Sequence, residues 1–407
     1  MQHKIFLLLG GNKLNFGILN KFKNAGYLVY VVDWNEHPQM TGDKHYRIDV
    51  KDSNAIIDAL KKDGVFDNVA FAYSSIDLAV PSVAKINRAI GLTTITDEGL
   101  KYSSSKSMMT QKWNEAGILN RISKKYTDFD NSIIEFNKKY KLIVKPDNSA
   151  SSRGITIVEK NADTETIKNA FNRAKTEASD NITVIEEFVD GTEFTVEMIG
   201  DNYGNVSVYG ISKKQHTKNT DNNKIAVKLH YNAVGADLQN KIAEFGIKCY
   251  KTLGFSSSLG HLEVLLKQDG TLSPVEIGAR SSGFIASDLV DIVSGSNFLG
   301  DLIKVQNGMP VKNGLHPQTD KSSLYFFYDF PDGYEIKKSV NLLDFTESSI
   351  ESRYFNRDNL YVGNKFTKID NDNARLGFEI LSGPKSVMTP EYIQIQEQAM
   401  LTKMNGR

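Results

Sequence analysis

The stretch LGHLEVLLKQDGTLSPVEIGAR, residues 259–280, decides the architecture that we predict for the centre of this chain. It contains two apolar runs separated by Gln268-Asp269-Gly270, a sequence typical of a tight turn, so we expect two antiparallel strands. Glu263 lies in the first strand and Glu276 in the second, each between apolar neighbours. Pairing about this turn brings the two carboxylates close together on one face of the sheet.

Two carboxylates that face each other in an apolar sheet repel, and their pKa values rise unless a cation lies between them. Magnesium held together with nucleotide phosphates removes this repulsion, because Mg²⁺ prefers oxygen ligands. Arg280 follows Glu276 closely and is placed to clamp a phosphoryl oxygen through two hydrogen bonds. The alternative is a trio of salt-bridged side chains that binds no metal.

A second candidate group surrounds Lys145, which lies near the end of the apolar run 142–146. A lysine at the end of a buried strand is costly without an anionic partner. The loop 147–153 is rich in small and hydroxyl-bearing residues and is closed by Gly154. Successive backbone N–H groups of such a hairpin form a nest for phosphate. The alternative is an ordinary β-hairpin in which Lys145 extends to solvent.

The sequence EEFVDGTE, residues 186–193, predicts a strand, a turn and a second strand. An adenine ring needs one acceptor for its exocyclic amine and one backbone N–H for a ring nitrogen, and a strand edge at a hinge provides both. A carboxylate a few residues later accepts from the two ribose hydroxyls. The alternative is a surface hairpin with solvated glutamates.

The N-terminal part alternates apolar strands (5–9, 27–32 and 69–72) with amphipathic helices, which predicts a parallel sheet covered on both faces. Gly10-Gly11 after the first strand, and Asp33 after the second, suggest a NAD site. The dinucleotide fingerprint G-x-G-x-x-G is missing, because the next glycine is Gly17. We therefore expect these glycines to serve a tight strand-to-helix turn.

The remaining segments complete the predicted organisation. We expect one helical segment over residues 97–118 and a polar, mobile loop over residues 213–228. After a linker at residues 313–321, short strands rich in Tyr and Phe and a final helix at residues 390–404 predict a separate α+β lobe.

Composition limits the classes of protein to which the chain can belong. Its 407 residues are too many for one ordinary core, so we expect two or three domains. Lys plus Arg and Asp plus Glu both number 49, which argues against a nucleic-acid partner. The single Cys249 excludes an internal disulfide and fits a reducing compartment. With no apolar run of membrane-spanning length, a cytoplasmic location without membrane contact is expected.

With these residues laid out in order, the chain resembles the ATP-grasp superfamily from about residue 1 to residue 310. The resemblance implies a mixed α/β and α+β fold. An N-terminal Rossmann-like domain without NAD spans residues 1–105, and two lobes that grip ATP between them follow, a small lobe at 106–190 and a large lobe at 191–310. A C-terminal α+β lobe spans residues 311–407.

By motif matching, the resemblance implies a role for each candidate residue. Lys106 and Lys145 match the lysines that contact phosphate, and Ser151, Ser152 and Gly154 belong to a flexible loop, residues 149–154, that covers the phosphates. The adenine contacts match Glu186, Glu187 and Val189, and the ribose contact matches Glu193. Glu263 and Glu276 match the carboxylates that hold magnesium. Arg280 matches the arginine after them and is a candidate catalytic residue.

The form E-I-x-A-R at residues 276–280 is similar to the branch that contains L-amino-acid ligases and carnosine-synthase-like enzymes. Many members of the superfamily have Asn two positions after the second glutamate as a metal ligand, whereas this chain has Gly278, which leaves the number of metal ions open. His230 roughly matches a histidine near the substrate in that branch and is a second catalytic candidate, although Asn232 replaces its neighbouring proline. The role of His216 stays open.

The resemblance implies an ATP-dependent carboxylate–amine ligase that acts on amino acids or forms dipeptides. ATP would convert a carboxylate to an acyl phosphate, and an amine would then displace phosphate to form an amide. The implied cofactors are ATP and Mg²⁺, with Mn²⁺ as the alternative ion, and the partners are small carboxylates and amines. A carboxylase or formyl-transfer enzyme of nucleotide or polysaccharide precursor synthesis, and an ATP-binding protein without turnover, are the alternatives. Tyr- and Phe-rich strands are expected to supply a homodimer face.

Overall fold

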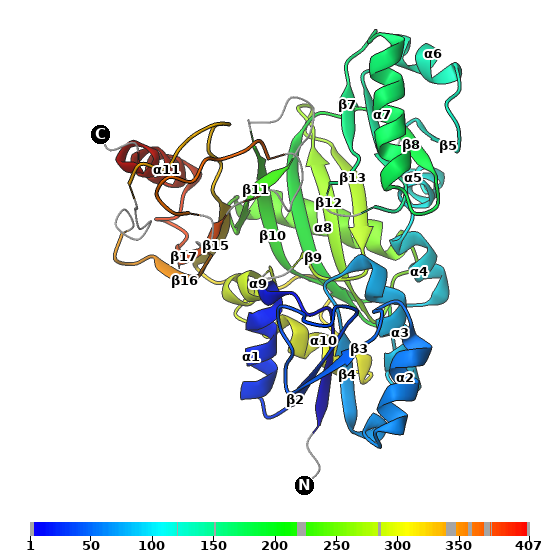
Figure 1. The fold of residues 1–407 in the computed structure, drawn as a ribbon, viewed down its shortest axis with the longest axis vertical. Helices are drawn as coiled ribbons and strands as arrows, with labels where there is room; N and C mark the ends of the chain where they lie inside the picture. The colour runs from blue at the N-terminus through cyan, green and yellow to red at the C-terminus, as the bar shows by residue number, and fades with distance from the viewer. Residues whose placement is uncertain are drawn as a thin grey trace.

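The computed structural model describes most of the chain and divides it into three β-sheets with helices around them (Figure 1). The described residues are 4–119, 121–149, 152–217, 225–283, 286–338, 347–356, 360–369, 375 and 377–404. No helix within these ranges is both long and apolar enough to cross a membrane.

The first sheet is the parallel one that the sequence predicts. Its strand order is β3-β2-β1-β4, and all three pairings are parallel. The strands are β1 (Ile5–Leu9), β2 (Leu28–Asp33), β3 (Lys44–Arg47) and β4 (Val69–Tyr73), and the helices are α1 (Phe16–Asn24), α2 (Ser53–Lys62) and α3 (Val80–Ala89). Strand β3 was not predicted, because the sequence of this strand, KHYR, contains no apolar run.

The contacts of the turn after β1 explain why glycine is needed there. The Asp33 carboxylate accepts a hydrogen bond from the Gly11 backbone N–H at 2.8 Å, which ties the end of β2 to the turn after β1. A Cβ atom at Gly11 would lie 2.7 Å from Pro38 Cβ and 2.8 Å from the Met40 carbonyl oxygen, so only glycine fits there.

The second sheet is small, antiparallel and ordered β5-β8-β6-β7. Its strands are β5 (Ser123–Tyr126), β6 (Leu142–Pro146), β7 (Thr156–Val158) and β8 (Thr183–Glu187), with α6 (Ser132–Lys139) and α7 (Thr164–Glu177) packed on it. Before it, the single helix predicted for 97–118 is two, α4 (Asp97–Ser103) and α5 (Lys106–Glu115). The break occurs because the Ser105 hydroxyl caps α5 by accepting from the Met108 N–H.

The third sheet is the largest and contains nine strands among the described residues. Its path is β13-β12-β9-β10-β11-β15-β17-β16, and β14 pairs with β10 at the side. The strands are β9 (Thr192–Gly200), β10 (Val206–His216), β11 (Ala226–Tyr231), β12 (Ser258–Leu266), β13 (Leu272–Gly278), β14 (Gly314–Leu315), β15 (Lys321–Phe327), β16 (Glu351–Asn356) and β17 (Phe378–Pro384).

The two faces of this sheet have different neighbours, because side chains alternate along each strand. Val196 on β9 and Leu262 on β12 pack under α8 (Ala236–Thr252), where Cys249 is buried as predicted. The opposite face carries Thr195 and Glu263, which line a cavity. The predicted loop over 213–228 is shorter than expected, since β10 continues to His216 and β11 begins at Ala226; residues 218–224 lie outside the described ranges.

Two later segments of the chain pack against, or pair with, elements that the sequence predicted to belong to other domains. Helices α9 (Ala286–Ser294) and α10 (Phe298–Gln306) share one apolar core with β1, as Leu289, Phe298 and Phe6 show. Strand β15 pairs antiparallel with β11 from Ser323 to Phe326, so the predicted separate C-terminal lobe continues the central sheet. Helix α11 (Pro390–Met404) closes this end of the molecule (Figure 1).

This continuity gives a prediction for stability. Leu324 on β15 is fully buried, and replacing it with Ala should cost about 2–5 kcal/mol of unfolding free energy. Native-state hydrogen exchange should become faster in β11 as well as in β17, because both strands pair with β15. Unchanged protection of β11 would mean that the C-terminal segment unfolds independently, contrary to the pairing described above.

Candidate functional site

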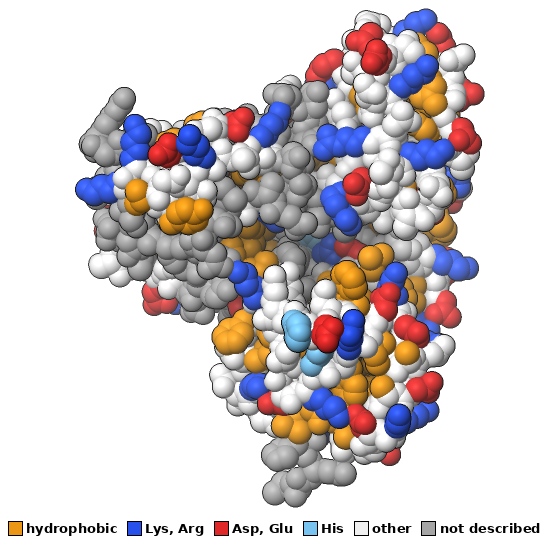
Figure 2. All heavy atoms as spheres, viewed as in Figure 1, with side chains coloured by type: hydrophobic (Ala, Val, Ile, Leu, Met, Phe, Trp, Pro, Cys, Tyr) orange, Lys and Arg blue, Asp and Glu red, His pale blue; other side chains and the backbone are white. Residues whose placement is uncertain are grey.

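A cavity of about 330 Å³ brings almost all predicted site residues together. Figure 2 shows the surface hollowed where the N-terminal part meets the two upper parts of the molecule. The predicted residues that line the cavity are Lys106, Lys145, Ser152, Glu186, Glu187, Val189, Glu193, Glu263, Glu276 and Arg280. Ser151 lies outside the described residues, and Gly154 and His230 do not line the cavity.

Glu263 and Glu276 are direct cross-strand partners on β12 and β13, as predicted. Each carboxylate has its own lysine: Lys214 Nζ lies 2.6 Å from Glu263, and Lys106 Nζ lies 3.2 Å from Glu276. Burial and the neighbouring carboxylates Glu193 and Glu276 raise the pKa of Glu263 above its usual value although Lys214 opposes the rise. At Glu276 burial acts in the same sense, but Lys106 and Lys145 outweigh it and lower the pKa.

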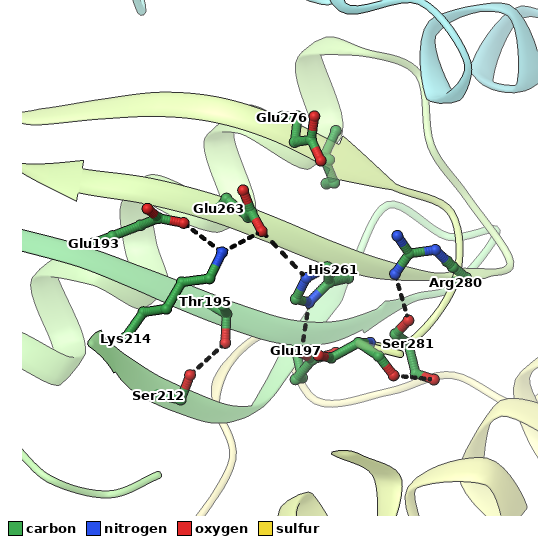
Figure 3. A network of polar contacts seen from close by, with 12 residues as sticks. Glu193, Thr195, Glu197, Ser212, Lys214, His261, Glu263, Glu276, Arg280 and Ser281 are labelled. Carbon is green, nitrogen blue, oxygen red and sulfur yellow. Dashed lines mark hydrogen bonds and ion pairs between the residues drawn. The ribbon is translucent and has the colours of Figure 1, made fainter. Parts of the chain in front are cut away.

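Lys214 is the central cation of this group, and the sequence analysis did not find it. Its ammonium bridges Glu193 and Glu263 at 2.6 Å each (Figure 3). Burial lowers the pKa of Lys214, but the two carboxylates outweigh burial and raise it, so the bridge is charged. His216 Nε2 lies 2.9 Å from the other oxygen of Glu193. Ser212, Lys214 and His216 occupy alternate positions along β10, a pattern that indicates one face of a strand, but we predicted a loop from residue 213.

Lys145 lies in a buried charge cluster with Glu186 and Arg121. Lys145 Nζ is 2.8 Å and Arg121 Nη1 is 3.1 Å from the same Glu186 oxygen, and the Thr110 hydroxyl donates to the other oxygen at 3.0 Å. Burial raises the pKa of Glu186, but the two cations outweigh it and lower the pKa to about 2. Glu186 therefore holds Lys145 in place, and its predicted contact with an adenine amine stays a prediction.

Lys106 is the first residue of α5 and lies where the predicted phosphate loop begins. Its ammonium donates to the Ser149 carbonyl oxygen at 2.8 Å. Ser152 and Gly154 both have positive φ, +57° and +72°. A Cβ atom at Gly154 would lie 2.9 Å from Glu177 Cβ, so this position needs glycine. Gly154 therefore shapes the loop, while Ser152 lines the cavity.

Arg280 is held by a partner from the N-terminal part of the chain. Its Nε and Nη2 donate to the two oxygens of Asp77 at 2.6 and 2.7 Å, which is a bidentate pair. A Cβ atom at Gly278 would lie 3.1 Å from Asp77 Oδ1 and 3.3 Å from Arg280 Cγ. A side chain at position 278 would crowd this pair, which gives a physical reason for glycine where many ATP-grasp members have Asn.

A second pair, His261 with Glu197, was not predicted from the sequence and lies beside Glu263. His261 Nδ1 is 2.6 Å from Glu197, and Glu197 also accepts from the Ser282 backbone N–H at 3.1 Å (Figure 3). The other ring nitrogen, Nε2, is 4.0 Å from Glu263. His261 thus lies between two carboxylates, one fully buried and one at the cavity wall.

The prediction that His230 is catalytic is not supported by its position. His230 pairs with Leu324 and shares the face of β11 and β15 that packs toward the C-terminal helix, whereas Leu229 and Tyr325 on the opposite face line the cavity. Burial lowers the pKa of His230 to about 4. The sequence could not settle this, because the face of a strand residue depends on register and pairing.

The residues present suit a divalent ion that is shared with a nucleotide. No group of three or more His, Cys, Asp or Glu side chains within the described ranges is arranged to hold a metal ion. Two paired carboxylates are nevertheless sufficient for Mg²⁺ when phosphate oxygens and waters complete its shell. Burial, and then the neighbouring carboxylates, raise the pKa of Glu263, so a further cation beside Glu263 would favour its charged form.

Breaking the buried pair should have a large effect on stability. Lys145 and Glu186 are 2% and 0% exposed, so Lys145→Met leaves a buried carboxylate short of a partner and should cost about 3–5 kcal/mol in urea unfolding. Lys145→Met/Glu186→Gln should recover part of this loss. The wild-type ion pair stabilises above pH 4.5 and loses its contribution as the pH falls toward about 2, a dependence that the double variant should lack.

The matched control is Lys138→Met. Lys138 pairs with Glu135 on the surface, where the side chains are 58% and 65% exposed, and should change stability by less than about 1 kcal/mol. Equal effects of the two single substitutions would contradict the role assigned to the buried cluster.

Comparison with known proteins identifies similarity in the region that contains most of these site residues. A family model described as an ATP-grasp domain matches residues 138–288. The D-alanine–D-alanine ligase of Buchnera aphidicola subsp. Schizaphis graminum is 27% identical over 223 residues, which cover 49% of this chain and 63% of that protein. The corresponding ligase of Cupriavidus taiwanensis is 27% identical over 173 residues, or 41% of this chain and 50% of that protein.

Solved structures extend the likeness to the whole fold. The L-amino acid ligase from Bacillus licheniformis superposes with a TM-score of 0.75 at 17% identity and covers 99% of this chain and 98% of its own. The biotin carboxylase domain of the 2-oxoglutarate carboxylase from Hydrogenobacter thermophilus has a TM-score of 0.68 at 14% identity, covering 94% and 87%. Residues 138–288 are therefore similar to an ATP-grasp domain, and the whole chain is similar in fold to these solved structures.

Proposed function

We propose that the protein is an ATP-dependent carboxylate–amine ligase that forms an amide and releases ADP and phosphate. The observation that carries this proposal is the convergence, in one cavity, of the Glu263–Glu276 pair with the three cations Lys106, Lys145 and Arg280. Phosphoryl transfer requires positioning and neutralisation of charge more than a nucleophilic side chain, and this cavity supplies both.

The nucleotide fits one end of the cavity. Ile143, Ile157 and Leu265 supply apolar walls for an adenine ring beside the backbone of Glu187 and Val189. Glu193 would accept from the ribose hydroxyls once Lys214 and His216 share it with the nucleotide. Lys106 and Lys145 would then lie along the phosphates.

In the first step, a substrate carboxylate oxygen attacks the terminal phosphorus of ATP, the bond to the bridging oxygen breaks, and ADP leaves. Lys106, Lys145 and Arg280 stabilise the charge on the moving phosphoryl group. A magnesium ion held by Glu263 and Glu276 would act as a Lewis acid on the phosphate oxygens. In the second step, a neutral substrate amine attacks the acyl carbon, the bond from that carbon to the phosphate oxygen breaks, and the leaving phosphate takes the proton that the amine loses as the amide forms.

The Asp77–Arg280 pair favours an amino acid over bicarbonate or formate. Asp77 lines the cavity with a side chain that is 31% exposed, beside an arginine that is 15% exposed. An α-amino acid presents an ammonium group to the first and a carboxylate to the second, whereas bicarbonate and formate have no cationic group for Asp77. This pair is the specific reason to prefer the ligase over the carboxylase or formyl-transfer alternative.

Water must be kept away from the acyl phosphate, because hydrolysis would waste it. Ser149, Ser152 and Arg153 line the cavity, and the loop to which they belong would serve as one cover. The loop predicted at residues 213–228 is a second candidate cover; it includes residues 218–224, which lie outside the described ranges.

A phosphate-release assay distinguishes the three functions. The protein is incubated with magnesium-ATP and a pool of amino acids, and free phosphate is measured with each component omitted in turn. Release that depends on amino acids supports the ligase. Release that depends on bicarbonate or formate supports the carboxylase or formyl-transfer alternative, and nucleotide binding without release supports the protein without turnover.

Glu276→Gln should lower phosphate release by at least about 10²-fold, because it removes one of the two charges proposed to hold magnesium. Its thermal unfolding midpoint should stay close to that of the wild type, since the amide keeps the shape and Glu276 is 32% exposed. Unchanged turnover in this variant would remove the metal assignment.

A further inference from the structure

The imidazole of His261 lines the cavity, but the nucleotide contacts described above do not use it. Its Nδ1 lies 2.6 Å from an oxygen of the fully buried Glu197. Glu197 also accepts from the Ser282 backbone N–H at 3.1 Å and from the Tyr231 hydroxyl at 3.4 Å. Because a carboxylate accepts hydrogen bonds and donates none, the ring proton of His261 lies on Nδ1. Nε2 is therefore an acceptor, and it points toward Glu263 (Figure 3).

The order of residues along β12 places His261 beyond the metal carboxylates as seen from the nucleotide. Leu265 at the adenine wall, Glu263 and His261 lie on the same face of the strand, because side chains alternate. Each step of two residues covers about 7 Å. His261 pairs with Gly278 on β13, and Arg280 follows Gly278 by two residues. The imidazole therefore lies on the side of Glu263 that leads to Arg280.

The attacking amine of the second step must arrive at this level of the sheet. The phosphoryl group is proposed to lie at Glu263 and Glu276, and the acyl carbon is joined to phosphorus through one oxygen. The nitrogen approaches that carbon from about 3–3.5 Å. Together these lengths amount to about one step along β12, taken from the metal carboxylates toward Arg280. The amine nitrogen then lies beside His261.

The gap between His261 Nε2 and Glu263 Oε1 suits a primary amine. The two atoms are 4.0 Å apart, so one nitrogen can lie about 2.9 Å from each of them. Lys214 already donates to Glu263 Oε1, but a carboxylate oxygen can accept a second hydrogen bond. A neutral primary amine has two N–H groups and one lone pair. If it donates to both acceptors, its lone pair stays free to attack the acyl carbon.

We propose that His261 is a catalytic residue that binds the attacking amine of the acceptor substrate through Nε2, with Glu263 Oε1 accepting the second N–H. This inference rests on the proposed ligase function. Glu197 is a positioning residue, because it fixes the tautomer and the orientation of the imidazole. Asp77 has a different task, since it holds the charged ammonium group of the donor amino acid, which has no lone pair. His261 takes no proton, because the leaving phosphate takes it.

Two substitutions of His261 separate this role from support of Glu197. His261→Asn keeps an N–H near the position of Nδ1, and with it the bond to Glu197, but removes the acceptor that faces Glu263. His261→Gln places an amide oxygen near the position of Nε2 and loses the bond to Glu197. His45→Asn is the control, because His45 lies on β3 and does not line the cavity.

Pairs of the common L-amino acids are incubated with magnesium-ATP, and both phosphate and dipeptide are measured. The C-terminal residue of the dipeptide identifies the amine substrate. The wild type and His45→Asn should form phosphate and dipeptide in equal amounts. His261→Asn should raise KM for the amine about tenfold, the effect of one lost hydrogen bond, and leave KM for ATP unchanged. It should also release more phosphate than dipeptide, because water then competes for the acyl phosphate.

His261→Gln should lie between the wild type and His261→Asn in both respects, since it keeps an acceptor. If His261→Asn is instead the less affected variant, His261 serves only Glu197, so the assignment of the amine site is wrong and the ligase function stands. Should His261→Asn fail to fold in thermal unfolding, His261→Gln decides: a raised KM for the amine alone supports the proposal, and equal changes in KM for ATP contradict it. If the wild type forms no dipeptide from any pair, the proposed function itself fails.

Discussion

The site depends on one electrostatic constraint: acidic side chains are concentrated on one buried face of the central sheet and must be neutralised. Glu193, Glu263 and Glu276 lie on three adjacent strands, and the sheet geometry gives them no means to move apart. Lys214 and Lys106 provide the compensation in this structure. Carboxylates that depend on a cation in this way are suited to a ligand that carries its own cation, which is what a magnesium nucleotide does.

The same constraint explains why distant segments of the chain must meet at the cavity. The cations come from α5, β6 and β10, and the counter-ion of Arg280 comes from the segment after β4 in the N-terminal sheet. The C-terminal strand β15 closes the far end through its pairing with β11.

The sequence predicted the local features well, because they follow from short patterns. The paired glutamates were predicted from two apolar strands and a tight turn, and the structure pairs them directly. Lys145 was predicted as a buried cation, but Arg121, which shares the Glu186 carboxylate with it, was not, because nothing near Arg121 in the sequence indicates that it meets Glu186. Asp77 was missed for the same reason, as its contact with Arg280 spans more than two hundred residues. The role of His230 stays a prediction; it shares a strand with Leu229, which lines the cavity, but does not itself line the cavity.

The most direct measurement is a crystal structure of the protein with Mg²⁺ and a non-hydrolysable ATP analogue. The account predicts one divalent ion in contact with a carboxylate oxygen of both Glu263 and Glu276, with the phosphates along Lys106 and Lys145. A nucleotide bound in the cavity while these two carboxylates contact only Lys214 and Lys106, with no ion between them, would contradict it.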